Sequence, residues 1–122
     1  MYEINIVKKL IVFISIVFSI AYSEIVYRVP IEGVIDLGLP PYVKRVIKEA
    51  EASNIDAIVF EINTFGGRVD AATQIKDAIL SSEVQTIAFI NRRAISAGAL
   101  ISLSCEKVFM TGGGCLLYTS PS

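Results

Sequence analysis

Apolar and polar positions change their spacing along the chain, and this pattern predicts the strands. Residues 55–62 (IDAIVFEI) and 84–91 (VQTIAFIN) are nearly continuous apolar runs of strand length, which is typical of parallel strands buried on both faces. Apolar and polar residues alternate over 25–35, and β-branched side chains are frequent there. This pattern predicts another strand, with a break near Pro30 or Gly33.

Helical spacing separates these predicted strands. Four apolar residues of the first predicted helix share one face at the spacing i, i+3, i+4 and i+7: Val43, Val46, Ile47 and Ala50. Further helices are expected at 69–80 and 96–104, and a short fourth strand at 107–110 (KVFM). The order β-α-β-α-β-α-β predicts an α/β fold with a largely parallel sheet and right-handed crossovers. In such sheets, sites form beyond the carboxyl ends of the strands.

The first 23 residues form a unit of their own. Lys8 and Lys9 precede an uncharged run, 10–22, which spans only about 20 Å as a helix, against about 30 Å for the hydrocarbon core of a bilayer. Ala21 and Ser23 are small residues at positions −3 and −1 of a possible cleavage site. We therefore expect residues 1–23 to be a signal peptide or an N-terminal membrane anchor, either of which exports the rest. A buried core helix is the remaining alternative.

The last eight residues, 115–122 (CLLYTSPS), differ abruptly in character from what precedes them. The string resembles one translated reading frame of a transposon adaptor used for sequencing libraries. We therefore expect 115–122 to be an adaptor artefact and the native chain to continue differently after residue 114. The alternative is an ordinary polar tail. Residues 24–114 are then the mature domain, which we expect to be partial.

Composition narrows the classes of function. The chain has 122 residues, which suits one small domain, and its 53% hydrophobic and 19% charged residues exclude a disordered chain. The net charge is −1, and no basic and aromatic residues interleave, so no nucleic-acid partner is expected. No Cys, His and Asp cluster has the spacing of metal ligands, so we expect no metal and no cofactor. Cys105 lies among apolar residues and is expected to be a small buried hydrophobe.

The candidate chemistry centres on one serine. Ser96, in NRRAISAGAL, opens a predicted helix directly after a strand, where free N–H groups and partial positive charge favour a developing anion. The Ala97 N–H could face an oxyanion, and Gly66 and Gly67, after the neighbouring strand, could supply a second donor. The structural alternatives are that Ser96 is only a helix N-cap and that the glycines are only a turn.

Other polar residues have structural explanations that we prefer. Glu61 and Asp70 form a possible carboxylate pair, but Asp70 suits the first turn of a helix and Glu61 the end of a strand. Arg92 and Arg93 could guide a peptide or an anionic lipid, but a solvated loop is the explanation that we favour.

Three segments carry a family resemblance: VPIEGVID, IVFEINTFGGRVDAATQIKDAI and INRRAISAGALISLSCEKVFM. They resemble the membrane-bound serine proteases of the NfeD family, in the ClpP class, over residues 25–110. The resemblance implies a ClpP/crotonase-like fold of repeated β-β-α and βαβ units, truncated at its C-terminal side. It also implies that Ser96 is the nucleophile and that Gly66, Gly67 and Ala97 form the oxyanion hole.

The same resemblance implies a Ser–Lys dyad, because the family's base is a lysine farther along the chain, beyond residue 114. Lys76 and Lys107 are the nearby alternatives, and both are better explained as structural or solvated side chains. This sequence departs from the family at Phe65, where proline is common.

The implied activity is that of a membrane-associated serine endopeptidase that cleaves apolar peptide segments on the extracytoplasmic face. The implied partners are a peptide substrate, a stomatin-like membrane protein, the membrane and further copies of the chain. We expect residues 24–114 alone, without the lysine, to be inactive. The alternatives are a crotonase-like acyl-CoA enzyme, which export disfavours, and a non-enzymatic membrane scaffold.

Overall fold

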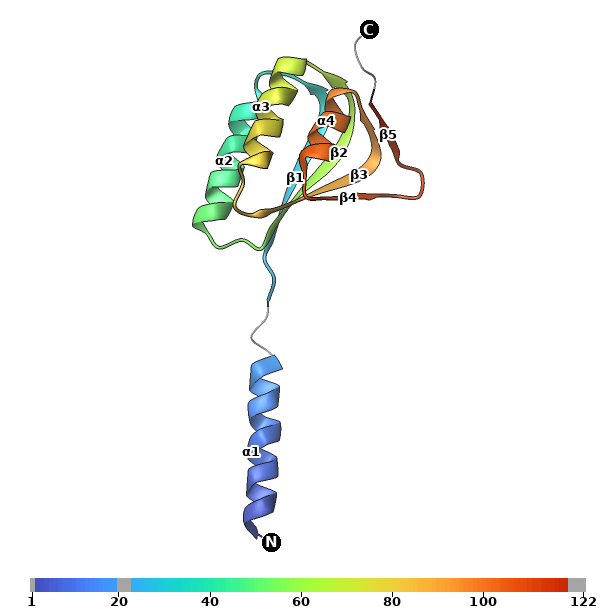
Figure 1. Ribbon diagram of the computed structural model, residues 1–122. Coiled ribbons are helices and arrows are strands. Elements are labelled where there is room, and N and C mark those ends of the chain that lie inside the picture. The colour runs from blue at the N-terminus through green and yellow to red at the C-terminus, as the bar shows by residue number, and fades with distance from the viewer. Residues whose placement is uncertain (1, 20–22, 119–122) are drawn as a thin grey trace.

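The computed structural model describes residues 2–19 and 23–118 (Figure 1). The elements in chain order are α1 (Tyr2–Ser19), β1 (Val26–Ile35), α2 (Leu39–Ala52), β2 (Ala57–Gly67), α3 (Val69–Leu80), β3 (Gln85–Ile95), α4 (Ala97–Ser104), β4 (Lys107–Met110) and β5 (Cys115–Leu117). The alternating helices and strands that the sequence predicts between residues 25 and 110 are all present.

The strands form one parallel sheet. Its order is β1-β2-β3-β4, every one of these pairings is parallel, and β5 also pairs in parallel with β3. The predicted α/β class with a parallel sheet is therefore confirmed. Since all strands run the same way, the carboxyl ends of β2 and β3 lie at one edge of the sheet, as a site at that edge requires.

The three helices α2, α3 and α4 lie on one face of this sheet (Figure 1). Each crossover leads to the next strand in the same direction, and right-handed crossovers of that kind all place their helices on the same side. The core between the layers includes the fully buried side chains Phe60 of β2, Ile75 of α3 and Ile90 of β3. No helix of the described residues covers the opposite face.

Strands β2 and β3 are longer than predicted. β2 continues through Gly66 and Gly67 because β1 pairs with both glycines after a register shift between Glu32 and Val34. The shift lies at Gly33, where φ is +75°, which agrees with the predicted break. β3 runs to Ile95 because its last residues pair with β5, a strand that was not predicted from the sequence.

The N-terminal helix α1 contributes nothing to the core. All of its residues are exposed, so the alternative of a buried core helix is wrong. Among the described residues, no helix combines the length and the apolar character needed to cross a membrane. The proposed cleavage site includes Ala21, which lies outside the described residues, and cleavage stays a prediction.

Candidate active site

Ser96 lies at the junction of β3 and α4 in an unusual backbone conformation. Its φ is 54° and its ψ is −111°, and Asn54 is the only other non-glycine residue with positive φ in the described part of the chain. Such a conformation costs about 1–3 kcal/mol and persists where the surroundings impose it. Here the Leu100 N–H donates to the Ser96 carbonyl at 3.1 Å. The Ser96 N–H donates at 2.8 Å to the carbonyl of Leu117, which belongs to the segment 115–122 that we expect to be an adaptor artefact.

The Ser96 hydroxyl is not a helix cap. Ser96 occupies the N-cap position of α4, but its side chain makes no capping hydrogen bond. Within residues 2–19 and 23–118, none of the side-chain hydrogen bonds involves this hydroxyl. The N-cap alternative is therefore wrong, and the hydroxyl of this half-buried residue is left available at the carboxyl edge of the sheet.

Gly66 brings the end of β2 against this junction. Its φ is +114°, and a Cβ built on it would lie 3.0 Å from the Ile95 carbonyl oxygen, 3.1 Å from the Ser96 Cβ and 3.3 Å from the Ala97 nitrogen. Only glycine allows this approach without a shift. Three of the predicted site residues, Gly66, Ser96 and Ala97, therefore do lie together.

The two glycine amides face different ways. The Gly66 N–H donates to the Thr64 Oγ1 at 3.0 Å, so it is already occupied. The Arg68 N–H donates to the Ile35 carbonyl of β1 at 2.8 Å. Because successive amides of a strand point to opposite sides, the Gly67 N–H between them points away from β1, toward β3 and Ser96. The geometry thus favours Gly67 over Gly66 as an available donor beside Ala97, the first residue of α4.

Gly67, like Gly66, has no room for a side chain. A Cβ on Gly67 would overlap the backbone of Ile35, with the nitrogen of that residue at 2.7 Å. Gly67 therefore packs directly on the end of β1, and the glycine pair is more than a flexible turn.

Thr64 belongs to the site although it was not among the predicted residues. Its side chain is 2% exposed and accepts the Gly66 N–H, two residues ahead in the chain. A threonine or serine that bonds the amide of residue i+2 is a recognisable local motif, so a hydroxyl residue two positions before the glycine pair was the available signal.

Glu61 and Asp70 do not form a carboxylate pair. Glu61 accepts from Arg28 at 2.5 Å and from the Asn91 amide at 3.1 Å, which links three strands on the uncovered face of the sheet. Asp70 lies in the first turn of α3 and accepts from Arg68, and this hydrogen bond lowers the pKa of the exposed Asp70 carboxyl below its usual value. The preferred explanation of Asp70, as a residue of the first helical turn, is confirmed. Glu61 does not end a strand, because β2 continues to Gly67, but it is held in a structural network.

The paired arginines of β3 differ in their surroundings. Arg92 is exposed, whereas the Arg93 guanidinium lies 4.4 Å from the centre of the Phe65 ring. Phe65 is 71% exposed at the carboxyl end of β2, so this cation–π contact lies at the same edge of the sheet as Ser96. Arg93 is therefore in part a packing residue and not simply solvated in a loop.

The two alternatives for a catalytic lysine have other surroundings. Lys76 pairs with Asp77 at 3.2 Å on α3. Lys107 is exposed and pairs with Ile87, near the amino end of β3. Ser96 follows the opposite end of the same strand, so Lys107 is roughly 30 Å away at 3.3 Å per residue.

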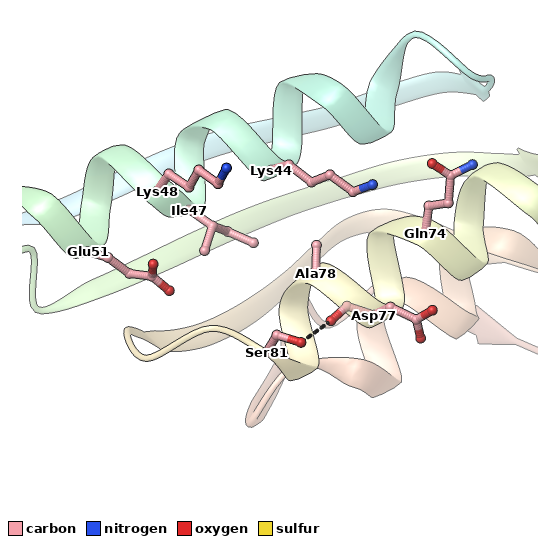
Figure 2. Close-up of a pocket in the computed structure, with 8 residues that line it drawn as sticks. All are labelled: Lys44, Ile47, Lys48, Glu51, Gln74, Asp77, Ala78 and Ser81. Carbon is pink, nitrogen blue, oxygen red and sulfur yellow. Dashed lines mark hydrogen bonds between the residues drawn. The ribbon is translucent and has the colours of Figure 1, made fainter.

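A hollow in the surface lies away from Ser96. A cleft of about 420 Å³ lies between α2 and α3, where Lys44 projects toward Gln74 (Figure 2). None of the predicted site residues lines this cleft, and Lys44 and Lys48 share it with Glu51 and Asp77, so it does not select one sign of charge. We place the candidate site at Ser96 because the strained junction, the free hydroxyl and the glycine contact coincide there.

Cys105 is buried, as predicted, between α4 and β4. Burial raises the pKa of its thiol to about 12. The thiol is therefore neutral near pH 7 and is a packing group rather than a nucleophile.

Comparison with known proteins identifies the family. The model of the NfeD1b N-terminal domain matches residues 25–117. The chain belongs to this NfeD family. The match confirms the resemblance, and it includes the three residues of β5, within the segment 115–122 that we expect to be an adaptor artefact. That expectation stays a prediction.

Two NfeD relatives are described as membrane proteins. The membrane protein NfeD1b of Bacillus subtilis (strain 168) is 37% identical over 94 residues, which are 77% of this chain and 22% of that protein. The membrane-bound protease PH1510 of Pyrococcus horikoshii is 33% identical over 112 residues, which are 89% of this chain and 25% of that protein. The chain thus spans about a quarter of these relatives.

Solved structures show the same fold. Two structures of the 1510-N membrane-bound stomatin-specific protease are similar to this chain. The serine-to-alanine mutant has a TM-score of 0.72 at 32% identity. The lysine-to-alanine mutant, in complex with a substrate peptide, has a TM-score of 0.71 at 34% identity. These matches cover 76% and 75% of this chain and 46% and 43% of those chains. A ClpP1 mutant from Listeria monocytogenes has a TM-score of 0.62 at 30% identity. This match covers 65% of this chain and 46% of the ClpP1 chain. The fold of this NfeD domain is therefore ClpP-like.

Proposed function

We propose that this NfeD domain is part of a membrane-associated serine endopeptidase in which Ser96 is the nucleophile. The observation that carries the proposal is the Ser96 junction, where a free hydroxyl on a strained backbone lies against Gly66 and beside the Ala97 amide. Relatives that share the domain are named as proteases, and one is a complex with a substrate peptide, which supports the assignment.

In this mechanism the Ser96 Oγ attacks the carbonyl carbon of the scissile peptide bond and gives its proton to the general base. The C–N bond then breaks as the base returns the proton to the leaving amine, and water hydrolyses the resulting ester of Ser96. The negative charge that develops on the carbonyl oxygen is stabilised by the N–H groups of Ala97 and Gly67. The Ala97 N–H faces out from the start of α4, and the Gly67 N–H points to the β3 side of β2. One such donor contributes about 3–4 kcal/mol in the transition state. The N-terminus of α4 adds partial positive charge.

The general base is a lysine supplied by the part of the protein that follows residue 114. A lysine buried next to Ser96 loses its proton near neutral pH because desolvation disfavours the ammonium ion. One relative is a lysine-to-alanine mutant in complex with a substrate peptide, and this supports the assignment. We do not assign the base to Lys107, which lies near the other end of β3, or to Lys76, which pairs with Asp77.

The substrate is an apolar peptide segment, and the carboxyl edge of the sheet is suited to it. Val34, Phe65 and Val69 are 75%, 71% and 65% exposed at the ends of β1 and β2 and the start of α3. By analogy with the stomatin-specific relative, a stomatin-like membrane protein is the proposed source of the segment. Residues 1–23 act as a signal peptide or anchor and place the domain on the extracytoplasmic face, where copies of the protein assemble.

The test is labelling of the full-length protein with a fluorophosphonate. We expect labelling at Ser96, and its loss in Ser96→Ala together with hydrolysis of apolar peptides. Ser104→Ala is the matched control, because Ser104 lies at the far end of the same helix and its hydroxyl donates to the Ile101 carbonyl at 2.6 Å. Tight binding of coenzyme A without labelling would support an acyl-CoA enzyme instead. The absence of both labelling and coenzyme A binding would support a scaffold.

A further inference from the structure

Thr64 carries a buried hydroxyl that both donates and accepts a hydrogen bond. The Oγ1 donates its single hydrogen to the Gly33 carbonyl and accepts the Gly66 N–H at 3.0 Å. Thr64 is 2% exposed, so no solvent is needed to explain either bond. The hydroxyl thus joins β1 to the glycine pair of β2.

The bond to Gly33 depends on the irregularity in β1. The β1–β2 ladder shifts register between Glu32 and Val34, and Gly33 has a φ of +75° there. A bulged residue leaves the regular ladder, and its carbonyl needs another donor. The Thr64 hydroxyl supplies that donor, and regular pairing resumes with Val34 opposite Gly66.

The methyl group of the same side chain contacts the other half of the site. A Cβ on Gly98 would overlap the Thr64 Cγ2, so Gly98 and Thr64 are packed directly together. Gly98 lies in the first turn of α4, two residues after Ser96. One side chain therefore fixes both the glycine pair and the start of the helix that follows Ser96.

We infer that Thr64 is a positioning residue for the Ser96 site: its hydroxyl turns the Gly66 N–H toward β1, so that the Gly67 N–H faces Ser96 together with the Ala97 N–H. The inference rests on the proposed function of Ser96. Thr64 contacts no substrate, and it acts through the orientation of the peptide units that follow it.

The experiment uses the full-length protein with Thr64→Val, which keeps the shape and loses the hydroxyl, and Thr64→Ser, which keeps the hydroxyl. We expect Thr64→Val to lower kcat for peptide hydrolysis by about tenfold to a hundredfold with KM within about threefold, since a misdirected Gly67 N–H weakens a contact that is made in the transition state. Thr64→Ser is expected to keep kcat within about threefold. The rate of fluorophosphonate labelling at Ser96 should follow kcat.

Thr86→Val is the matched control. Thr86 is also 2% exposed, and its hydroxyl also accepts a backbone amide, that of Glu106 at 3.2 Å, but it lies near the amino end of β3. We expect its kcat to stay within about threefold of the wild type. An independent readout is hydrogen exchange at Gly66, which should accelerate at least about tenfold in Thr64→Val and not in Thr64→Ser or Thr86→Val.

The outcomes separate the two proposals. If Ser96→Ala loses labelling but Thr64→Val and Thr86→Val have equal kcat, the Thr64 inference is overturned and the proposed function stands. If labelling persists in Ser96→Ala, the proposed function is overturned and the Thr64 inference falls with it. Should Thr64→Val not fold, Thr64→Cys, which keeps only a weak donor and acceptor, must show a selective loss of kcat. A wild-type kcat in that variant overturns the inference.

Discussion

At the scale of single residues, the site depends on backbone conformations that side chains normally avoid. Ser96 has positive φ without being glycine, and Gly66 has the φ of +114° that its contact with Ser96 requires. Strain of this kind is retained only where surrounding contacts impose it, and it is common at active sites. The hydroxyl of Ser96 is therefore presented at a cost in stability.

This cost can be measured by comparing Ser96→Gly with Ser96→Ala in the full-length protein. Glycine tolerates φ of 54° and alanine does not, so we expect Ser96→Gly to be the more stable variant by about 1–2 kcal/mol. Thermal unfolding followed by intrinsic fluorescence would measure the difference. Equal midpoints would show that the junction is relaxed, and both variants should lack labelling by a fluorophosphonate.

The buried thiol of Cys105 predicts a dependence of stability on alkaline pH. Burial, assisted by the charge of Glu106 and opposed by a bond from Thr86, raises its pKa from 9.0 to about 12. The folded state therefore keeps a proton that the unfolded state releases above pH 9, and stability that is complete below pH 9 is lost as the pH rises toward 12.

Cys105→Ala removes this titration. We expect its free energy of unfolding to fall less steeply between pH 9 and 11 than that of the wild type, by at most about 1.4 kcal/mol per pH unit. Urea unfolding at a series of pH values would give both slopes. Parallel slopes would mean that the thiol ionises in the folded protein as readily as in the unfolded chain.

At the scale of elements, α4 is held on the sheet by close contact rather than by large side chains. Gly98 meets the Thr64 Cγ2 so closely that no Cβ fits, and Ala97 and Ala99 beside it are buried as well. The run SAGA is thus explained by the approach of the helix to β2, and the position of Ser96 depends on that approach.

A double-mutant cycle tests this contact. Gly98→Ala alone is expected to destabilise the protein by roughly 1–3 kcal/mol, because the added methyl overpacks the interface. In the Thr64→Ser background the Cγ2 is absent, and the same substitution should cost at least about 1 kcal/mol less, since alanine also favours the helix. Additive effects in thermal unfolding would contradict direct packing of these two residues.

The elements were predictable from the sequence to different degrees. The apolar runs of β2 and β3 and the spacing in α2 specify strands and helices directly, because burial sets their periods. The continuation of β2 through Gly66 and of β3 to Ile95 was not predictable, since it depends on pairing with β1 and β5, which are distant in sequence. Ser96 and the glycines were found from their types and order. The role of Thr64 was missed because it depends on the carbonyl of Gly33, 31 residues earlier.

At the scale of the whole molecule, the sheet has one covered and one uncovered face. The uncovered face carries the Arg28–Glu61–Asn91 network and several apolar side chains, of which Val26 and Phe109 are 48% and 55% exposed. Parallel sheets are normally covered on both faces, so this surface is expected to associate with other protein.

We therefore predict that residues 24–114 produced alone are inactive and self-associate, and that Val26→Lys with Phe109→Lys reduces the association. Sedimentation velocity at several concentrations would measure it. The matched control is Leu80→Lys with Leu103→Lys, which adds the same charge at positions 64% and 58% exposed on the helices. Equal reduction by both pairs would indicate a general charge effect instead of a contact through the sheet.

If the proposed peptidase function holds, the common direction of the strands has a further consequence for where cleavage can occur. β1 begins directly after the N-terminal segment, and its 10 residues run toward the edge that holds Ser96. At 3.3 Å per residue, the serine stands roughly 30 Å from the point where the chain enters the domain. If α1 tethers the protein to a bilayer, a target must reach out by about the thickness of the hydrocarbon core to be cleaved. Segments that lie on the lipid surface would then not be cleaved. The distance of a peptide bond from the membrane would therefore contribute to substrate specificity.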